Sequence, residues 1–181
     1  MALTVEGTLQ RLATCLCESL AAAGRSVCRC CLIPGTAGTS LTSEGCECGL
    51  AWVRLAQLAP PTGRKAQACL ARPGEAVLVT ATIEVGVRRC FPAGSGVDSL
   101  AQVTCECAQQ HALDLLADMN VMYGLPHCCD LDPTTRYGPY VPDGPEGLCV
   151  GARLTLFVPA WVCVDCPSPA ESPGESPGES P

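Results

Sequence analysis

Residues 76–90 constrain the fold of this chain more than any other stretch, because apolar and polar side chains alternate along them. The apolar series is Val77, Val79, Ala81, Ile83, Val85 and Val87, and it alternates with Thr80, Thr82, Glu84 and Arg88. A period of two marks a strand with one face buried and one face turned toward water. The sequence therefore predicts a long, half-buried antiparallel strand, which Pro92 ends.

Three further strands and two helices are predicted around this strand. Short apolar or alternating runs indicate strands at 26–33, 46–58 and 148–158, and helical spacing of apolar side chains indicates helices at 3–23 and 98–120. The joining segments are too short for repeated crossover helices. The order α-β-β-β-α-β therefore predicts an α+β fold, in which both helices pack on an antiparallel or mixed sheet.

Turn-forming residues set the limits of these elements. Gly24 is expected to stop the first helix, and the Pro- and Gly-rich stretch 124–147 is expected to be a loop. Residues 1–166 are interpreted as a single domain, since a chain that is 48% apolar and this long can build a core of its own. Residues 167–181 repeat the unit ESPG and are predicted to be disordered, because they have almost no apolar side chain to bury.

Charge and hydropathy argue against several classes of protein. The formal net charge of −7 disfavours binding to nucleic acid through phosphate neutralisation. No stretch reaches the roughly 18 uncharged apolar residues that a membrane span needs, and the first residues lack the basic start of an export signal. The two histidines, His111 and His127, accompany no nucleophile motif, so neither an enzyme nor a cofactor is expected.

Sixteen cysteines raise the question of a metal site. Zinc sites favour Cys-x-x-Cys pairs, and Cys163 and Cys166 form one such pair. Most other spacings are Cys-x-Cys or Cys-Cys, and two cysteines at Cys-x-Cys spacing on a strand lie about 7 Å apart, too far to chelate one ion comfortably. No metal site is predicted.

Disulfides are the stronger interpretation for selected cysteines. Cys28 or Cys31 could face Cys46 or Cys48 across two neighbouring strands, and Cys90 could face Cys149 at strand ends. Other cysteines, among them Cys15 and Cys107 on helical stripes, are expected to be small buried side chains.

Four sequence blocks in fixed order carry a family resemblance: CECGLAWVRL at 46–55, EVGVRRCFP at 84–92, CC at 128–129 and YVPDGPEGLCVGARLTLFV at 140–158. Together they resemble the tail terminator and head-to-tail connector proteins of long-tailed actinobacteriophages. The resemblance implies a lambda-type terminator: a small subunit that forms a hexameric ring at the head-proximal end of the tail tube. Such a ring ends tail growth and joins tail to head without catalysis.

The resemblance also implies partners, a location and a set of structural or assembly residues. The partners are further copies of the chain, the tail tube protein and the head connector, and DNA passes through the lumen without specific binding or any membrane contact. The location is the virion neck, after assembly in the host cytoplasm. The candidate residues are Trp52, Arg54, Gly86, Val87, Arg89, Cys90, Gly144, Pro145, Gly147, Cys149 and Gly151.

Two kinds of alternative remain open from the sequence. One is a head-completion or stopper protein, which forms a neighbouring ring of the same neck. The other is a cysteine-rich protein of a different class, either a secreted binding protein or a zinc-binding regulator.

Overall fold

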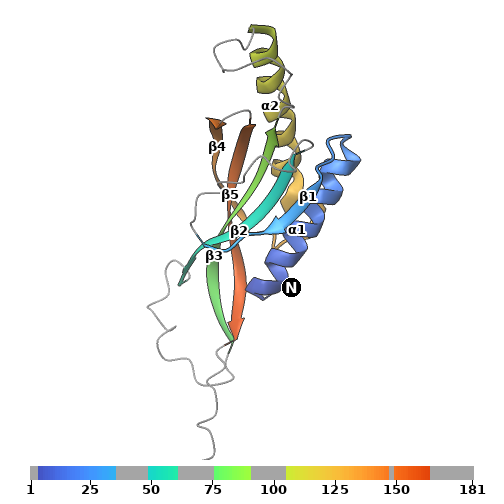
Figure 1. Ribbon diagram of the computed structural model, residues 1–181. Coiled ribbons are helices and arrows are strands. Elements are labelled where there is room, and N and C mark those ends of the chain that lie inside the picture. The colour runs from blue at the N-terminus through green and yellow to red at the C-terminus, as the bar shows by residue number, and fades with distance from the viewer. Residues whose placement is uncertain (1–3, 36–48, 61–75, 91–104, 147–148, 164–181) are drawn as a thin grey trace, which may run out of the picture.

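Two helices lie on one face of a five-stranded mixed sheet, which confirms the predicted α+β class (Figure 1). The computed structural model describes residues 4–35, 49–60, 76–90, 105–146 and 149–163. The elements are α1 (Val5–Ala22), β1 (Arg29–Leu32), β2 (Leu50–Ala59), β3 (Ala76–Cys90), α2 (Cys105–Cys128), β4 (Arg136–Glu146) and β5 (Cys149–Cys163).

The sheet has the order β1-β2-β3-β5-β4, and only the short pair β1–β2 is parallel. The strand that the alternating pattern predicts is β3, and it occupies the centre. It pairs with β5 along its whole length, from Ala76 opposite Cys163 to Cys90 opposite Cys149. A strand with neighbours on both edges and a helix-covered face needs apolar side chains at every second position, and β3 supplies them.

The core fills the space between this sheet and both helices. Ala81, Ile83 and Val85 of β3 are fully buried there, as the alternating pattern predicts. The helical stripe of α1 meets them with Leu12, Leu16 and Leu20, and α2 adds Met122 and Leu125. Trp52 and Leu50 lie on the opposite face of the sheet from Ala51 and Val53, which also agrees with the sequence pattern.

Local signals at both ends fix the limits of α1. The Thr4 hydroxyl accepts a hydrogen bond from the Gly7 amide at 3.1 Å, which caps the start of the helix. Gly24 has a φ of +69°, its amide donates to the Ala21 carbonyl, and the Arg25 amide donates to the Leu20 carbonyl. These bonds form a Schellman motif, so the predicted stop at Gly24 is confirmed.

The prediction of a loop at 124–147 is wrong at its beginning. Helix α2 continues through Pro126 to Cys128, because burial of Met122 and Leu125 outweighs the cost of a proline in the last turn. A second Schellman motif then ends α2: the Leu131 amide donates to the Pro126 carbonyl, and Asp130 takes the left-handed conformation with φ +49°.

The same prediction is also wrong at its end, where residues 136–146 form β4. The sequence pattern did not predict this strand, because Pro139, Pro142 and Pro145 within it are typical of loops. Proline lacks the amide that a central strand must donate, but an edge strand tolerates it. β4 lies at the edge of the sheet and pairs only with β5, with register shifts between Tyr137 and Tyr140 and between Asp143 and Glu146.

We expect Val87→Asp to destabilise the protein by about 3 kcal/mol or more, because an unpaired carboxylate would enter the core. Val87 is 1% exposed and lies between Ala51 and Ala152 on the helix-covered face. The free energy of unfolding in urea measures the loss. The control is Thr82→Asp, on the opposite face of β3, which should lose far less; equal losses would contradict the register.

Candidate functional site

A buried carboxylate joins three elements at one end of the sheet. Asp118 of α2 is 0% exposed. Its Oδ1 accepts hydrogen bonds from Arg25 Nε at 2.5 Å and from Arg89 Nη2 at 2.8 Å, and its Oδ2 accepts from Arg89 Nε at 2.8 Å. Both carboxylate oxygens are therefore bonded to guanidinium groups, as a buried charge requires.

Backbone positions explain how the two arginines reach Asp118. Arg25 follows Gly24 directly, so the Schellman motif of α1 places it beside α2. Arg89 follows Val87 by two positions and points to the same, helix-covered side of β3. The two arginines are also bonded to each other, since Arg89 Nη2 donates to the Arg25 carbonyl at 2.9 Å.

Asp114, one turn before Asp118 on α2, completes this ion-pair cluster. Its side chain and its carbonyl both accept from Arg25, at 3.2 and 2.9 Å. The hydrogen bond to Asp118 raises the pKa of Arg25 above its ordinary value, and this effect exceeds the opposing effect of burial. The cluster fixes the ends of α1 and β3 to the middle of α2.

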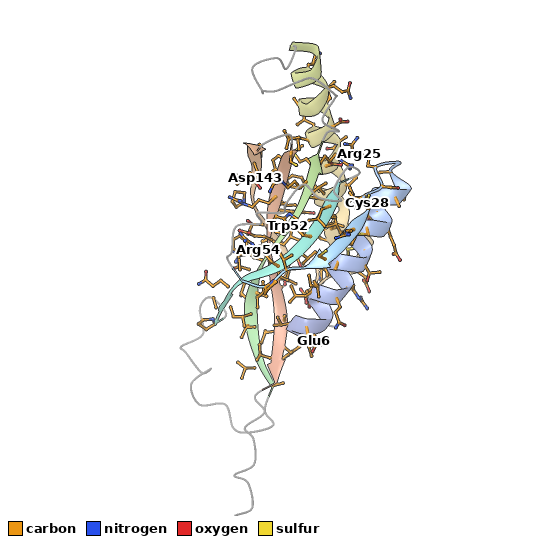
Figure 2. The ribbon with its side chains drawn as sticks, viewed as in Figure 1. Glu6, Arg25, Cys28, Trp52, Arg54 and Asp143 are labelled. Carbon is orange, nitrogen blue, oxygen red and sulfur yellow. A yellow bond between two sulfur atoms is a disulfide. The ribbon has the colours of Figure 1, made fainter. Side chains whose placement is uncertain are left out.

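The face of the sheet opposite the helices carries an aromatic contact between neighbouring strands. Trp52 of β2 lies opposite Gly86 of β3 and is 5% exposed. A Cβ atom at Gly86 would overlap the Trp52 indole, so the glycine is what allows the ring to lie flat on β3. The guanidinium carbon of Arg54 lies over the ring, 5.4 Å from its centroid, and Arg54 pairs with Glu84. Figure 2 labels Trp52 and Arg54.

Two further contacts lie on this face, nearer the β4 edge of the sheet: an ion pair between β5 and β4, and a close contact between β5 and β3. Arg153 of β5 donates to Asp143 of β4 at 3.0 Å. A Cβ atom at Gly151 would lie 2.9 Å from the Val87 carbonyl oxygen, so a side chain there would force β5 away from β3. Positions 86 and 151 therefore require glycine, because a larger residue would collide with the neighbouring strand.

Two tyrosines attach the edge strand β4 to α2. The Tyr140 hydroxyl donates to the Leu115 carbonyl at 3.0 Å, and the Tyr137 hydroxyl donates to the Tyr123 carbonyl at 2.7 Å. The register shift between them is a bulge that lets residues three apart face the same helix. Burial, with a smaller contribution from the charge of Asp118, raises the pKa of Tyr140 to about 12.

The residues singled out from the sequence fall into four places, except for one that lies outside the described residues. Trp52, Arg54, Gly86 and Gly151 lie on the uncovered face, whereas Val87 and Arg89 face the helices. Cys90, the last residue of β3, lies opposite Cys149, the first residue of β5. Gly144 and Pro145 belong to the backbone of β4, and Gly147 lies outside the described residues.

Sequence reasoning missed Arg25, Asp114 and Asp118. One signal could have found them: Asp114 and Asp118 are four residues apart and so share one face of a predicted helix. The pairing with Arg25 and Arg89 depends on contacts across the fold, and no local pattern contains it.

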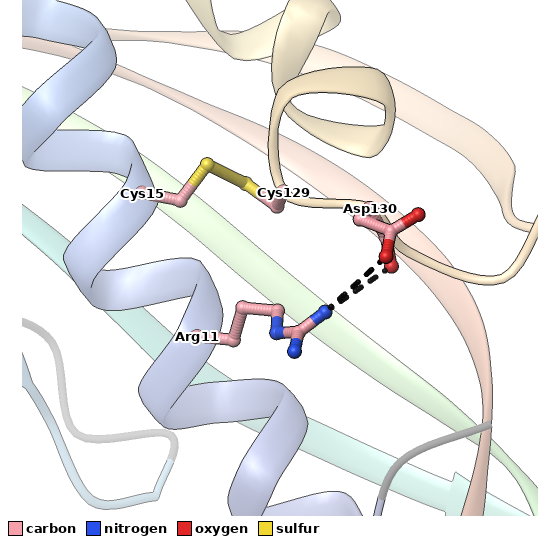
Figure 3. Close-up of a disulfide and its surroundings, with 4 residues drawn as sticks. All are labelled: Arg11, Cys15, Cys129 and Asp130. Atoms are coloured by element: carbon pink, nitrogen blue, oxygen red, sulfur yellow. Dashed lines mark hydrogen bonds and ion pairs between the residues drawn. A yellow bond between two sulfur atoms is a disulfide. The ribbon is translucent and has the colours of Figure 1, made fainter. Parts of the chain in front are cut away.

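Two disulfides join cysteines outside the predicted set. Cys15 bonds to Cys129, with 5.7 Å between their Cα atoms (Figure 3), and Cys17 bonds to Cys30, with 6.3 Å between theirs. The expectation that Cys15 is a free buried thiol is therefore wrong. The sequence could not reveal this pair, because its members are 114 positions apart in the chain.

The six candidate disulfide cysteines have mixed outcomes. Cys28 and Cys149 take part in disulfides, whereas Cys31 has a free thiol, which corrects the alternative that placed it in a bond. Cys31 packs beside Trp52, on the face away from α1. Cys46 and Cys48 lie outside the described residues, as does Cys107's side chain.

Across the described segments, no three His, Cys, Asp or Glu side chains gather into a set that could hold a metal ion. Within the same segments, no helix combines the length and the apolar character needed to span a bilayer. Comparison of the chain with known protein families and with characterised proteins gives no match.

We expect Asp118→Asn to destabilise the protein by about 3–5 kcal/mol, since two partly buried guanidinium groups would lose their compensating charge. The control is Asp143→Asn, which breaks the more exposed pair with Arg153 and should cost about 1 kcal/mol or less. Urea denaturation of both variants gives the comparison. A loss at Asp118 no larger than that at Asp143 would show that the cluster does not support the fold.

We expect Gly86→Ala to destabilise the protein by about 1–3 kcal/mol, because the new methyl group overlaps the Trp52 ring. Gly124→Ala is the matched control. Gly124 is helical, and the nearest atom to its added Cβ is 4.0 Å away, so this change should stabilise α2 by about 0.5–1 kcal/mol. Thermal unfolding of both variants should show shifts of opposite sign; shifts of the same sign would contradict the packing of Trp52.

We expect stability to fall as pH rises from about 10 to about 12. The ordinary tyrosine pKa is 10.0, and that of Tyr140 in the folded protein is about 12. Above pH 10 the unfolded chain therefore loses this proton first, and unfolding becomes progressively easier. Absorbance of the phenolate during titration measures the step, and Tyr140→Phe should remove the highest-pH part of the curve. An unchanged curve would assign that step to another tyrosine.

Proposed function

We propose that this chain is a structural subunit that assembles into a ring at the head-proximal end of a phage tail, where it ends tail growth and joins tail to head. The observation that carries the proposal is the placement of the resembling blocks. Residues 50–55, 84–90, 140–146 and 149–158 lie on β2, β3, β4 and β5, so they are neighbours in one sheet. Their ordered resemblance therefore corresponds to one structural unit.

The edge of the sheet favours subunit contacts made by side chains. Pro139, Pro142 and Pro145 remove three amide donors from β4, so a neighbouring copy cannot easily extend the sheet there. A closed ring needs two different surfaces that meet head to tail. We propose that these surfaces belong to the helices and the uncovered face of the sheet.

A neck ring also needs a contact at each end, one for the tube and one for the head connector. The subunit is long in Figure 1, where the first half of α2 extends beyond the sheet and β2 and β5 end on the other side. Large apolar side chains are exposed on α2 and near the ends of β2 and β5. Leu113 and Leu116 of α2 are 51% and 50% exposed, and Leu58 and Trp161 lie near the ends of β2 and β5. Exposed apolar side chains in such positions suit protein contacts.

The charge of the chain fits a ring through which DNA passes. A formal net charge of −7 provides little attraction for phosphates. Such a lumen would let the genome move without holding it, and the proposal includes no catalytic step.

The test is to add purified protein to tail tubes that are still growing and to follow tube length by electron microscopy. The wild-type protein should cap tubes and limit their length. The double variant Leu113→Gln and Leu116→Gln should fold normally and cap poorly, because it removes the exposed apolar pair on α2. The control is Ala112→Gln, which places the same side chain at an exposed position of α2.

Each outcome has a clear meaning for the proposal. Capping by wild type and by Ala112→Gln, but not by the double variant, supports both the ring and the α2 contact. Attachment to filled heads in place of tubes would move the protein to the stopper ring. No attachment to either particle would contradict the proposal.

One observation favours a second candidate from a different class. The disulfides Cys15–Cys129 and Cys17–Cys30 are typical of proteins that work outside a reducing cytoplasm. A secreted binding protein would satisfy this observation. Detection of the protein in culture medium without phage particles would favour that class.

A further inference from the structure

Three cysteines line one open cavity beside α1. The cavity has a volume of about 480 Å³, and Cys15, Cys128 and Cys129 all line it. Cys15 and Cys129 form a disulfide that ties α1 to the end of α2 (Figure 3). Cys128 is the last residue of α2 and has a free, exposed thiol. A free thiol and a disulfide are therefore adjacent in the chain and open onto the same space.

The bond itself is far less accessible than the neighbouring thiol. Cys15 is 9% exposed and Cys129 is 3% exposed. Thiol–disulfide exchange requires the attacking sulfur to reach a disulfide sulfur, so its rate depends on access. A small disulfide in solution therefore meets Cys128 first, and a small thiol in solution has little access to either bonded sulfur.

We propose that Cys128 is a thiol–disulfide exchange site, through which low-molecular-weight thiols and disulfides open and close the Cys15–Cys129 bond. The inference concerns the isolated subunit, so it holds whether or not the subunit forms a ring. It assigns a chemical role to the CC pair at 128–129, for which the proposed function has no use.

Closing the bond takes three exchanges. The Cys128 thiol gives its proton to water, and its thiolate attacks a small disulfide; one small thiolate leaves and takes up a proton. The Cys15 thiolate then attacks Cys128 Sγ and displaces the second small thiolate. Finally the Cys129 thiolate attacks Cys15 Sγ and releases Cys128. One small disulfide is reduced to two thiols, two protein thiols become one disulfide, and Cys128 ends as it began.

Opening the bond follows the same steps in reverse. The Cys128 thiolate attacks Cys15 Sγ and frees Cys129, and small thiols then resolve the Cys15–Cys128 bond. Attack on Cys15 is favoured over attack on Cys129, because a bond between adjacent cysteines would strain the planar peptide group between them. Cys128 is in the last turn of α2, where helix ends move most easily.

The second disulfide provides an internal contrast. Cys30 bonds to Cys17 of α1, and its neighbour Cys31 is also a free thiol. However, Cys30 and Cys31 alternate on strand β1, so Cys31 lies on the other face of the sheet, against Leu50 and Trp52. A neighbouring free thiol is thus present at both bonds, but Cys31 lies on the other face of the sheet from Cys30, whereas Cys128 lines the same cavity as Cys15 and Cys129.

The experiment starts from the folded, oxidised protein and adds reduced glutathione. Samples are blocked by alkylation at intervals, and peptide mass spectrometry follows loss of the Cys15–Cys129 bond. Cys128→Ser should open the bond at least about tenfold more slowly than wild type, since no neighbouring thiolate is left to attack Cys15 Sγ. Cys31→Ser, the matched control, should open it at the wild-type rate. The glutathione adduct in wild type should map to Cys128.

Two results would overturn the proposal. One is an equal opening rate in Cys128→Ser and wild type. The other is a wild-type adduct that maps to Cys15 or Cys129, which would show direct attack on the bond. The adduct map needs no variant, so it decides the question even if Cys128→Ser does not fold.

Discussion

The fold depends on the pairing of one buried carboxylate with two arginines. Asp118 has no contact with water, so it must receive its hydrogen bonds from the protein, and Arg25 and Arg89 provide all three. These arginines come from the segment after α1 and from the end of β3. Because a partial arrangement would leave a buried charge without compensation, α1, α2 and the sheet must adopt their positions together.

The two faces of the sheet carry different kinds of side chain. The helix-covered face holds the apolar core and the tyrosines that connect β4 to α2. The other face carries Trp52 on Gly86 and the pair Arg54–Glu84. Because Gly86 and Gly151 have no side chain, the strands can lie close enough for these contacts. The uncovered face can therefore carry polar and aromatic side chains without weakening the core. Such a face suits the subunit contacts that we propose.

Local patterns in the sequence were enough to predict the elements whose signals are local. The alternation of β3 and the stop at Gly24 correctly predicted a strand, its buried face and a helix end. β4 could not be predicted in this way, because its prolines are acceptable only at the edge of a sheet, and edge position depends on the whole fold. The Asp118 cluster and the Cys15–Cys129 bond likewise join residues far apart in the chain.

The most direct test of the proposed neck ring is cryo-electron microscopy of the phage particles in which we propose that this chain is a subunit. The account predicts a closed ring of identical subunits at the neck, with the sheet order β1-β2-β3-β5-β4 in each subunit and the protruding half of α2 in contact with a neighbouring component. A neck without this chain, together with a purified protein that stays monomeric in the presence of tail tubes, would contradict it.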